Sequence, residues 1–193
     1  MPLSLAPFRH LVLVTAAVTA LGGCAPLVVG GAAVGGAMAV DRRSVGVQIE
    51  DEAIEQRINN AIIGRFGKDQ ININVTAYNR QVLLAGQVLD EKTKADAEAL
   101  AKVQQNVGNV FNELEVRPIA SLGTRSNDTA LSGKVRAALV AETGVPSGTI
   151  RVTTENSVVY LMGRVTAAEG DLSARVASRQ SGVARVVKLF EAP

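Results

Sequence analysis

The stretch Ile71–Val88 reads ININVTAYNRQVLLAGQV, and it has the clearest structural pattern in the chain. Its first half is an extended run over Ile71–Thr76, which is followed by the polar pair Asn79-Arg80. Asn tolerates the left-handed backbone that a tight hairpin requires. The second half has an apolar residue or a glycine at every second position, namely Val82, Leu84, Gly86 and Val88. This period of two is typical of a strand, so the stretch predicts a β-hairpin.

The same hairpin recurs farther along the chain. A shift of 77 residues places Ile73–Thr76 on Ile150–Thr153 and the turn Asn79-Arg80 on Asn156-Ser157. The shift also matches the alternating strand with a second set of four residues, Val159, Leu161, Gly163 and Val165. A register of this length indicates two copies of one structural module.

A helix is predicted before each hairpin. Apolar residues recur there at i, i+4 and i+8, in the first copy as Ile54, Ile58 and Ile62 and in the second as Leu131, Val135 and Leu139. This spacing is typical of one face of an amphipathic helix. Asp51 and Asp128 precede the two runs, and Asp is a preferred N-cap residue. We therefore expect a helix to open at each Asp, the second running from about Asp128 to Glu142.

A second helix and a last strand complete each module. The helices are expected over about 92–106 and 167–181, and the strands end near Val116 and Phe190. The order is α-β-β-α-β in both copies. The sequence thus predicts an α+β fold, in which each module has a small three-stranded mixed sheet packed on two helices.

The repeat divides the chain into five segments. We assign residues 1–23 to a signal peptide, 24–49 to a lipidated tether, 50–117 to the first module, 118–126 to a linker and 127–193 to the second module. Each module has fewer than 70 residues, a size at which burial alone gives marginal stability. We therefore expect the two modules to pack against each other.

The N-terminus has the features of an export and anchoring signal. Arg9 and His10 precede an apolar run over Leu11–Leu21, which is typical of a secretory signal peptide and short for a membrane span. Leu21-Gly22-Gly23-Cys24 resembles a lipobox, so Cys24 is the predicted lipidation site. Ala25 follows the Cys, and lipoproteins that stay in the inner membrane typically have Asp there. We expect an outer-membrane anchor facing the periplasm.

Residues 25–40 leave two interpretations open. Gly31 and Gly35 have the small-xxx-small spacing that packs helices in lipid, whereas the many glycines also suit a flexible tether. A single transmembrane helix that includes this stretch is disfavoured, because Pro26 and the glycines would destabilise it repeatedly.

Composition argues against several classes of function. The formal net charge is +2, which gives no strong field toward nucleic acid. The only His, His10, lies in the predicted signal peptide, and the only Cys is the predicted lipidation site. The mature chain would then lack the parts of a Ser-His or Cys-His nucleophile and of a His or Cys metal site. We expect no enzymatic activity, no cofactor and no metal.

The two modules differ in surface charge. Residues 50–117 have eleven acidic and eight basic side chains, whereas residues 127–193 have six acidic and eight basic ones. Since their core patterns are alike, we expect the two modules to have different roles. The basic second module suits an anionic membrane surface.

One helix face in the second module is the candidate lipid-binding site. At 100° per residue, Leu131, Val135, Ala138 and Leu139 share the predicted core face. The opposite face has small and apolar residues with Lys134, and Arg136 on its flank; the candidate residues are Ala130, Gly133, Lys134, Arg136, Ala137, Val140 and Ala141. This pattern suits shallow insertion at an anionic lipid surface. The alternative is that this face packs on the first module.

Several motifs resemble the BON domain. They are Asp-x-x-Ile/Leu at Asp51 and Asp128, the Val-x-Leu-x-Gly-x-Val strands, and the closing Gly182-Val183-x-x-Val186. Further matches resemble the outer-membrane lipoproteins that have two BON domains: Asp41–Gly46, Ile73–Tyr78, Thr153–Asn156, Leu161–Gly163 and Ala177–Arg179.

The resemblance implies a protein that supports envelope integrity. It implies binding of anionic phospholipid, such as phosphatidylglycerol, through the second BON domain, and enrichment at division sites. It also implies that the helix with Ala130 makes the lipid contact, although a family member has an aromatic residue at the position of this Ala, and such an interfacial anchor is missing here. The alternative function is a periplasmic adaptor, whose first BON domain docks an envelope assembly factor or a cell-wall hydrolase activator.

Overall fold

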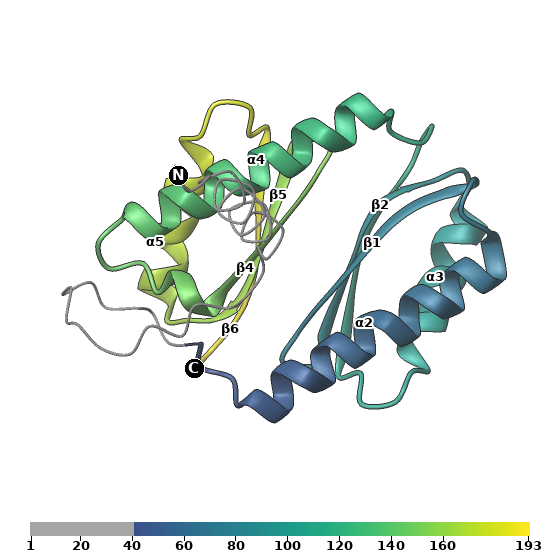
Figure 1. The fold of residues 1–193 in the computed structure, drawn as a ribbon, viewed down its shortest axis with the longest axis horizontal. Coiled ribbons are helices and arrows are strands. Elements are labelled where there is room, and N and C mark those ends of the chain that lie inside the picture. The colour runs from purple at the N-terminus through teal and green to yellow at the C-terminus, as the bar shows by residue number, and fades with distance from the viewer. Residues whose placement is uncertain (1–40) are drawn as a thin grey trace, which may run out of the picture. The chain divides into compact units, whose positions relative to one another are not determined.

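The structure is a computed structural model, and it describes residues 41–193. The first module contains α2 Val45–Phe66, β1 Ile71–Tyr78, β2 Gln81–Val88, α3 Glu91–Lys102 and β3 Asn109–Val116. The second contains α4 Leu122–Ala141, the short 3₁₀ turn Ser147–Thr149, β4 Ile150–Glu155, β5 Val158–Arg164, α5 Ala167–Ser178 and β6 Arg185–Glu191 (Figure 1). The predicted α+β class and the order α-β-β-α-β are confirmed in both modules.

Each module has a three-stranded mixed sheet with the hairpin's second strand at its centre. The order is β1-β2-β3 in one sheet and β4-β5-β6 in the other. The hairpin strands pair antiparallel, and the last strand returns parallel to the central one after a helix. β1 and β4 are therefore edge strands, each with one side free of sheet hydrogen bonds.

The central strands are buried on both faces. In the first module Val82 and Leu84 pack on the helices, whereas Leu83 and Ala85 point to the other side of the sheet. The corresponding strand of the second module alternates in the same way, with Leu161 toward its helices. The side-chain period of two thus separates a helix-facing core from a second apolar face in each module.

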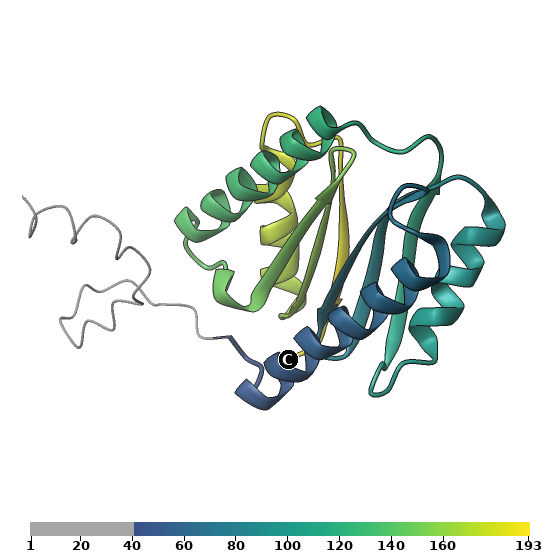
Figure 2. The same cartoon turned by 45° about the vertical axis from the view of Figure 1, so that its right-hand side comes forward.

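That second face is where the two modules pack together. The apolar cluster between the sheets consists of Tyr78, Leu83, Ala85, Val158, Tyr160 and Met162, with Phe111, Val187 and Leu189 partly buried against it. Figure 2 shows the two sheets facing each other, with the helices on the outer sides. The expectation that the modules pack together is confirmed for the described residues.

Equivalent residues meet at the contact between the modules. Thr76 and Thr153 are separated by the 77-residue repeat, and their Oγ1 atoms are 3.0 Å apart. A contact between equivalent positions places the two modules about a local pseudo-twofold axis, as in a symmetric dimer. The chain thus resembles a homodimer joined into one polypeptide.

Asp51 and Asp128 bind the hairpin turns. The Asp51 carboxylate accepts hydrogen bonds from the backbone N–H groups of Asn79 and Arg80, both at 2.7 Å. Asp128 accepts from Asn156 at 2.8 Å and from Ser157 at 2.9 Å. All four turn residues have positive φ, from 50° to 65°, as the predicted tight hairpins require. Each carboxylate satisfies two turn N–H groups that the hairpin leaves unpaired.

The prediction that these two Asp residues cap the helices is therefore wrong. Both lie inside a helix and are almost fully buried. The caps are Ser44 and Ser121, whose hydroxyl groups accept from Val47 N and Thr124 N at 3.3 and 3.1 Å. α4 consequently begins at Leu122, inside the stretch 118–126 that the sequence assigned to the linker. α2 likewise begins at Val45, inside the predicted tether 24–49.

The second helix of each module ends earlier than predicted. α3 stops at Lys102 and α5 at Ser178, and a turn follows each of them. These turns contain Asn106 and Gly182 with φ of 63° and 101°, a left-handed backbone that cannot continue an α-helix. The last strands end where the sequence predicts, close to Val116 and Phe190.

Glycines in the central strands allow the hairpin strands to approach closely. A Cβ on Gly86 would lie 2.0 Å from the carbonyl oxygen of Asn72, and one on Gly163 would lie 2.5 Å from that of Thr149. Both contacts are too short for a side chain, so these are close-packing positions.

The segment that enters the first helix binds both modules. Arg42 donates to the Arg164 carbonyl oxygen at 2.8 Å and forms a 2.8 Å salt bridge with Glu169 in the second module. Arg43 forms 2.7 Å salt bridges with Asp51 and Asp41, and its guanidinium lies 4.0 Å from the Tyr78 ring centroid. The hydrogen bond from Arg42 lowers the pKa of Glu169 to about 2.

We predict that Asp51→Asn destabilises the protein more than Asp128→Asn does. Either change weakens two hydrogen bonds to a turn, at a cost of about 1–3 kcal/mol. Asp51→Asn also removes one of the two carboxylate partners of Arg43, which is largely buried. Asp41 keeps Arg43 paired, so the lost charged hydrogen bond should add about 1.5–3 kcal/mol. Urea unfolding of both variants gives the two free energies. Equal losses, or losses below about 0.5 kcal/mol, contradict the assigned role of the carboxylates.

Candidate functional site

The candidate lipid-binding face of α4 is open to solvent. The core face is buried at Leu131, Val135 and Leu139, as predicted. All seven candidate residues are exposed: Ala130, Gly133, Lys134, Arg136, Ala137, Val140 and Ala141. Val140 is 71% exposed, a large value for an aliphatic residue on a helix. The alternative that this face packs on the first module is wrong, because all seven residues are exposed, and the sheet contact of Arg136 is with β4 of its own module.

The two cations of this candidate face extend from α4 on different sides. Lys134 Nζ donates to the Ser181 carbonyl oxygen at 3.1 Å and also binds the Ser181 hydroxyl, in the loop before β6. Arg136 donates to the Val152 carbonyl oxygen at 2.7 Å, on the outer edge of β4. Lys134 therefore borders the exposed apolar face, whereas Arg136 points toward the first module.

A hollow lies beside Lys134, at the N-terminal end of the exposed face. It has a volume of about 400 Å³ and is lined by α4 and by two loops of the second module. The hydroxyls of Ser157 and Ser181 and the Lys134 ammonium line it together. These are groups that bind a phosphate oxygen well.

A larger cleft lies between the modules, and the sequence did not predict it. This interdomain cleft has a volume of about 520 Å³ and is bounded by α2, β1, α4 and β4. Three arginines line it, two from α4 and one from β4: Arg125, Arg136 and Arg151. No local pattern could have revealed it, because it exists only once the two sheets pack against each other.

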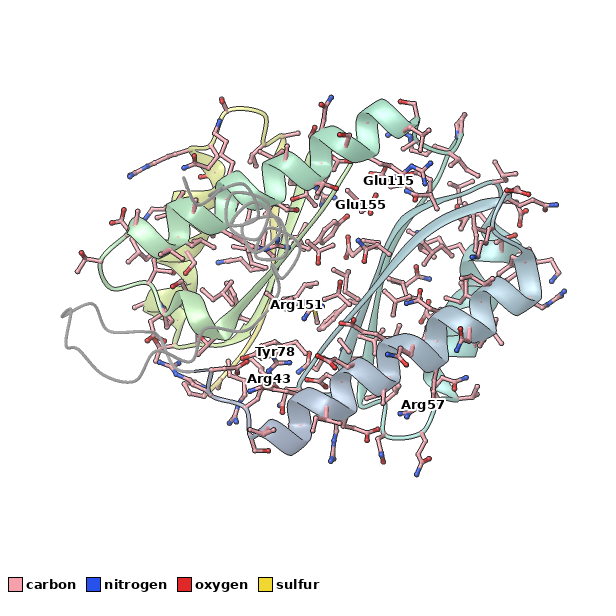
Figure 3. The ribbon with its side chains drawn as sticks, in the orientation of Figure 1. Arg43, Arg57, Tyr78, Glu115, Arg151 and Glu155 are labelled. Carbon is pink, nitrogen blue, oxygen red and sulfur yellow. The ribbon has the colours of Figure 1, made fainter. Side chains whose placement is uncertain are left out.

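Two carboxylates of the cleft are partly desolvated. Burial, together with the nearby charge of Asp128, raises the pKa of Glu155 to about 7. Asn72 of the first module donates to Glu155 at 3.3 Å, so this carboxyl lies at the contact between the modules. Burial also raises the pKa of Glu55, which accepts from the Ala77 N–H at 2.8 Å and from Arg151 at 3.1 Å. Figure 3 shows Arg151 and Glu155 on the same strand.

Within residues 41–193 no group of three His, Cys, Asp or Glu side chains is placed to hold a metal ion. In the same range no helix has the length and hydropathy to cross a membrane. Cys24, the predicted signal peptide and residues 25–40 lie outside the described residues, so the lipidation site stays a prediction.

Comparisons with known proteins match this architecture. The BON-domain family model matches residues 50–118 and 127–192. The chain is 36% identical over 190 residues to outer membrane lipoprotein DolP of Haemophilus influenzae, covering 98% of both chains. It is 34% identical over 152 residues to a 21 kDa hemolysin of Actinobacillus pleuropneumoniae, covering 78% of both. It is 30% identical over 145 residues to osmotically-inducible protein Y of Escherichia coli, covering 74% of this chain and 72% of the relative.

We predict that Glu155→Gln changes how stability depends on pH. Because the pKa of Glu155 is higher in the folded state, the native protein binds more protons than the unfolded chain between about pH 4.5 and 7. The stability of the wild type should therefore fall as the pH rises through this window. Gln cannot ionise and should remove this fall.

The test is the melting temperature of both proteins at pH 5 and pH 8. Relative to the wild type, Glu155→Gln should be more stable at pH 8 than at pH 5. Glu169 does not interfere, since its pKa of about 2 lies well below the window. The same difference in melting temperature at both pH values would show that Glu155 is not coupled to folding in this way.

Proposed function

The chain belongs to the BON-domain family, and from this premise we propose that it is an outer-membrane lipoprotein of the DolP type. Its second BON domain binds anionic phospholipid, and the protein supports envelope integrity without catalysing a reaction. The observation that carries the proposal is the exposed face of α4, where small and apolar side chains lie beside cations on a fully folded domain.

Lipidation and the α4 face would act together at the membrane. Acyl chains on Cys24 contribute about 0.8 kcal/mol for each buried methylene and hold the protein at the periplasmic side of the outer membrane. The helix then needs only weak affinity, because the anchor keeps it close to the surface. This weak contact can select membrane regions rich in anionic lipid, and enrichment at division sites is part of the proposal.

The physical character of the face suits shallow insertion. Gly133, Ala137 and Ala141 have almost no side chain, so the helix backbone can lie close to the lipid headgroups. Val140 supplies apolar area, while Lys134 attracts anionic headgroups at about 1 kcal/mol per cation. The hollow between Lys134 and Ser181 is placed to receive a headgroup phosphate. Since no aromatic residue lies on this face, electrostatic attraction should dominate, and salt should weaken binding.

An adaptor role for the first BON domain is the second candidate. This domain has the more acidic surface, and its α3 end exposes Val103, which is 76% accessible. Val103 lines a shallow hollow with Leu100 and charged residues of both signs, so this site suits a partner with an apolar side chain. Such a partner would be an envelope assembly factor or a cell-wall hydrolase activator.

We predict that Cys24→Ser abolishes lipidation. The chain has no other thiol that can accept a diacylglyceryl group. Metabolic labelling with a radioactive fatty acid should mark the wild type and leave the variant unlabelled. Label retained on Cys24→Ser would contradict the lipoprotein assignment.

We predict that Lys134→Glu combined with Arg136→Glu abolishes binding of residues 41–193 to phosphatidylglycerol vesicles at low salt. Ala130→Trp should strengthen the same binding, since Trp prefers the membrane interface. Vesicle pelleting measures both effects, and thermal unfolding confirms that the variants are folded. The matched control is Lys92→Glu with Lys102→Glu, an equal charge reversal on exposed residues of α3.

At the same low salt concentration, binding of the control variant should remain close to that of the wild type. If the α4 double variant binds as well as the control, the lipid contact lies elsewhere. If both lose binding equally, the interaction depends on total charge, and the face of α4 has no special role.

A further inference from the structure

We propose that the interdomain cleft is a docking site for an extended acidic peptide segment, which pairs with the outer edge of β1. The cleft is separate from the exposed face of α4, since apart from Arg136 none of its lining residues belongs to that face. The proposal therefore does not depend on lipid binding.

The first support is the orientation of the two edge strands. Ala77 turns its N–H outward to Glu55, and Val152 turns its C=O outward to Arg136. Alternate residues of an edge strand present their backbone groups on the same side. Ile73 and Val75 on β1 therefore present both N–H and C=O groups to the cleft they line. An extended peptide can add to such an edge by main-chain hydrogen bonds.

Side-chain hydrogen bonds occupy only some of the outward backbone groups on the edges of β1 and β4. Glu55 occupies one N–H near the C-terminal end of β1, and Arg136 occupies one carbonyl of β4. The contacted residues, Ala77 and Val152, are next in sequence to the Thr76–Thr153 contact, and such side-chain contacts discourage unlimited sheet growth. The stretch of β1 over Ile73–Val75 is not covered by either contact.

The second support is the charge of the cleft. Within residues 41–193 neither Arg125 nor Arg136 forms a salt bridge with a carboxylate. Glu55 is already paired with Arg151, and both oxygens of Asp128 bind the hairpin turn. Glu155, with a pKa of about 7, is only partly charged at neutral pH. The cleft thus has as many arginines as carboxylates, but Arg125 and Arg136 have no carboxylate partner there, and acidic side chains of a ligand would complement them.

The third support is the chemistry of the walls. Hydroxyl and amide side chains line both sides, including Asn74, Thr129 and Thr153, and only three aliphatic residues contribute: Ile73, Val75 and Val152. Acyl chains of a lipid would find little apolar surface there. The volume of about 520 Å³ lies within the range of pockets that bind ligands, about 300–1,000 Å³. A polar, charged site between two strand edges favours a polypeptide.

The experiment uses three fluorescein-labelled heptapeptides and the acylated mature chain in detergent micelles. The acidic probe is Thr-Asp-Val-Glu-Val-Asp-Thr. The basic probe replaces its acidic residues with Lys, and the third probe replaces its Glu with Pro, which lacks the N–H needed for strand pairing. Fluorescence anisotropy at low salt should show binding of the acidic probe, and affinities weaker by at least about tenfold for the other two.

Neighbouring residues of α4 provide matched variants. Thr129→Trp fills the cleft and should weaken binding of the acidic probe by at least about tenfold, whereas Ala130→Trp points away from the cleft and should not. Arg125→Glu should also weaken it, and Lys134→Glu should not. All four positions are exposed, so thermal unfolding should confirm intact folding. The amide protons of Ile73 and Val75 should exchange more slowly when the acidic probe is bound.

The proposal is overturned if the acidic probe does not bind, or if Thr129→Trp binds it as well as the wild type does. Equal binding of the basic or the Pro-containing probe overturns the assigned charge or the strand pairing. Thr129→Trp should pellet with phosphatidylglycerol vesicles like the wild type. Loss of peptide binding with intact vesicle binding therefore separates this site from the lipid-binding face.

Discussion

The buried carboxylate that joins the first helix of each module to its hairpin turn is the contact on which the rest of the structure depends. Asp51 and Asp128 each receive two backbone N–H groups from a turn whose residues have positive φ. The contact fixes both the rotation and the height of the helix over the sheet. Because the core face of α4 is fixed in this way, Gly133 and Ala137 must face solvent. The same contact holds Asp128 at the wall of the interdomain cleft.

Duplication explains why one chain has two different surfaces on one architecture. The modules share their cores and meet at equivalent residues, as the Thr76–Thr153 contact shows. Core positions tolerate little change, because a buried cavity or charge is costly in a module of this size. Surface positions are free to diverge: Asn59 of α2 corresponds to Arg136 of α4, which binds the edge of β4. The same core packing thus occurs in a module with an acidic surface and in a module with a basic surface.

Much of the fold follows from local patterns, and the candidate sites follow only in part. The hairpins, the central strands and the exposure of the α4 face were predictable, because Val82–Val88 and Leu131–Leu139 have clear periods of two and of 3.6. The role of Asp51 was not, since an acidic residue before an apolar helical run resembles a cap. The interdomain cleft was not predictable either, because its walls come from strands far apart in the sequence. The contact of Arg42 with Glu169 was not predictable either, because the two residues lie far apart in the sequence.

We propose that the outward face of α4, and not the equivalent face of α2, meets the membrane. Val140 and Ile63 occupy equivalent positions in the two modules, and they are 71% and 38% exposed. A nitroxide spin label at Val140→Cys or Ile63→Cys, with Cys24→Ser in both, reports local access to oxygen and to a polar nickel reagent. With phosphatidylglycerol vesicles, the label at position 140 should gain access to oxygen and lose access to nickel, while the label at position 63 stays in water. Labels that respond alike, or a label at position 140 that does not respond, would contradict a membrane contact through α4.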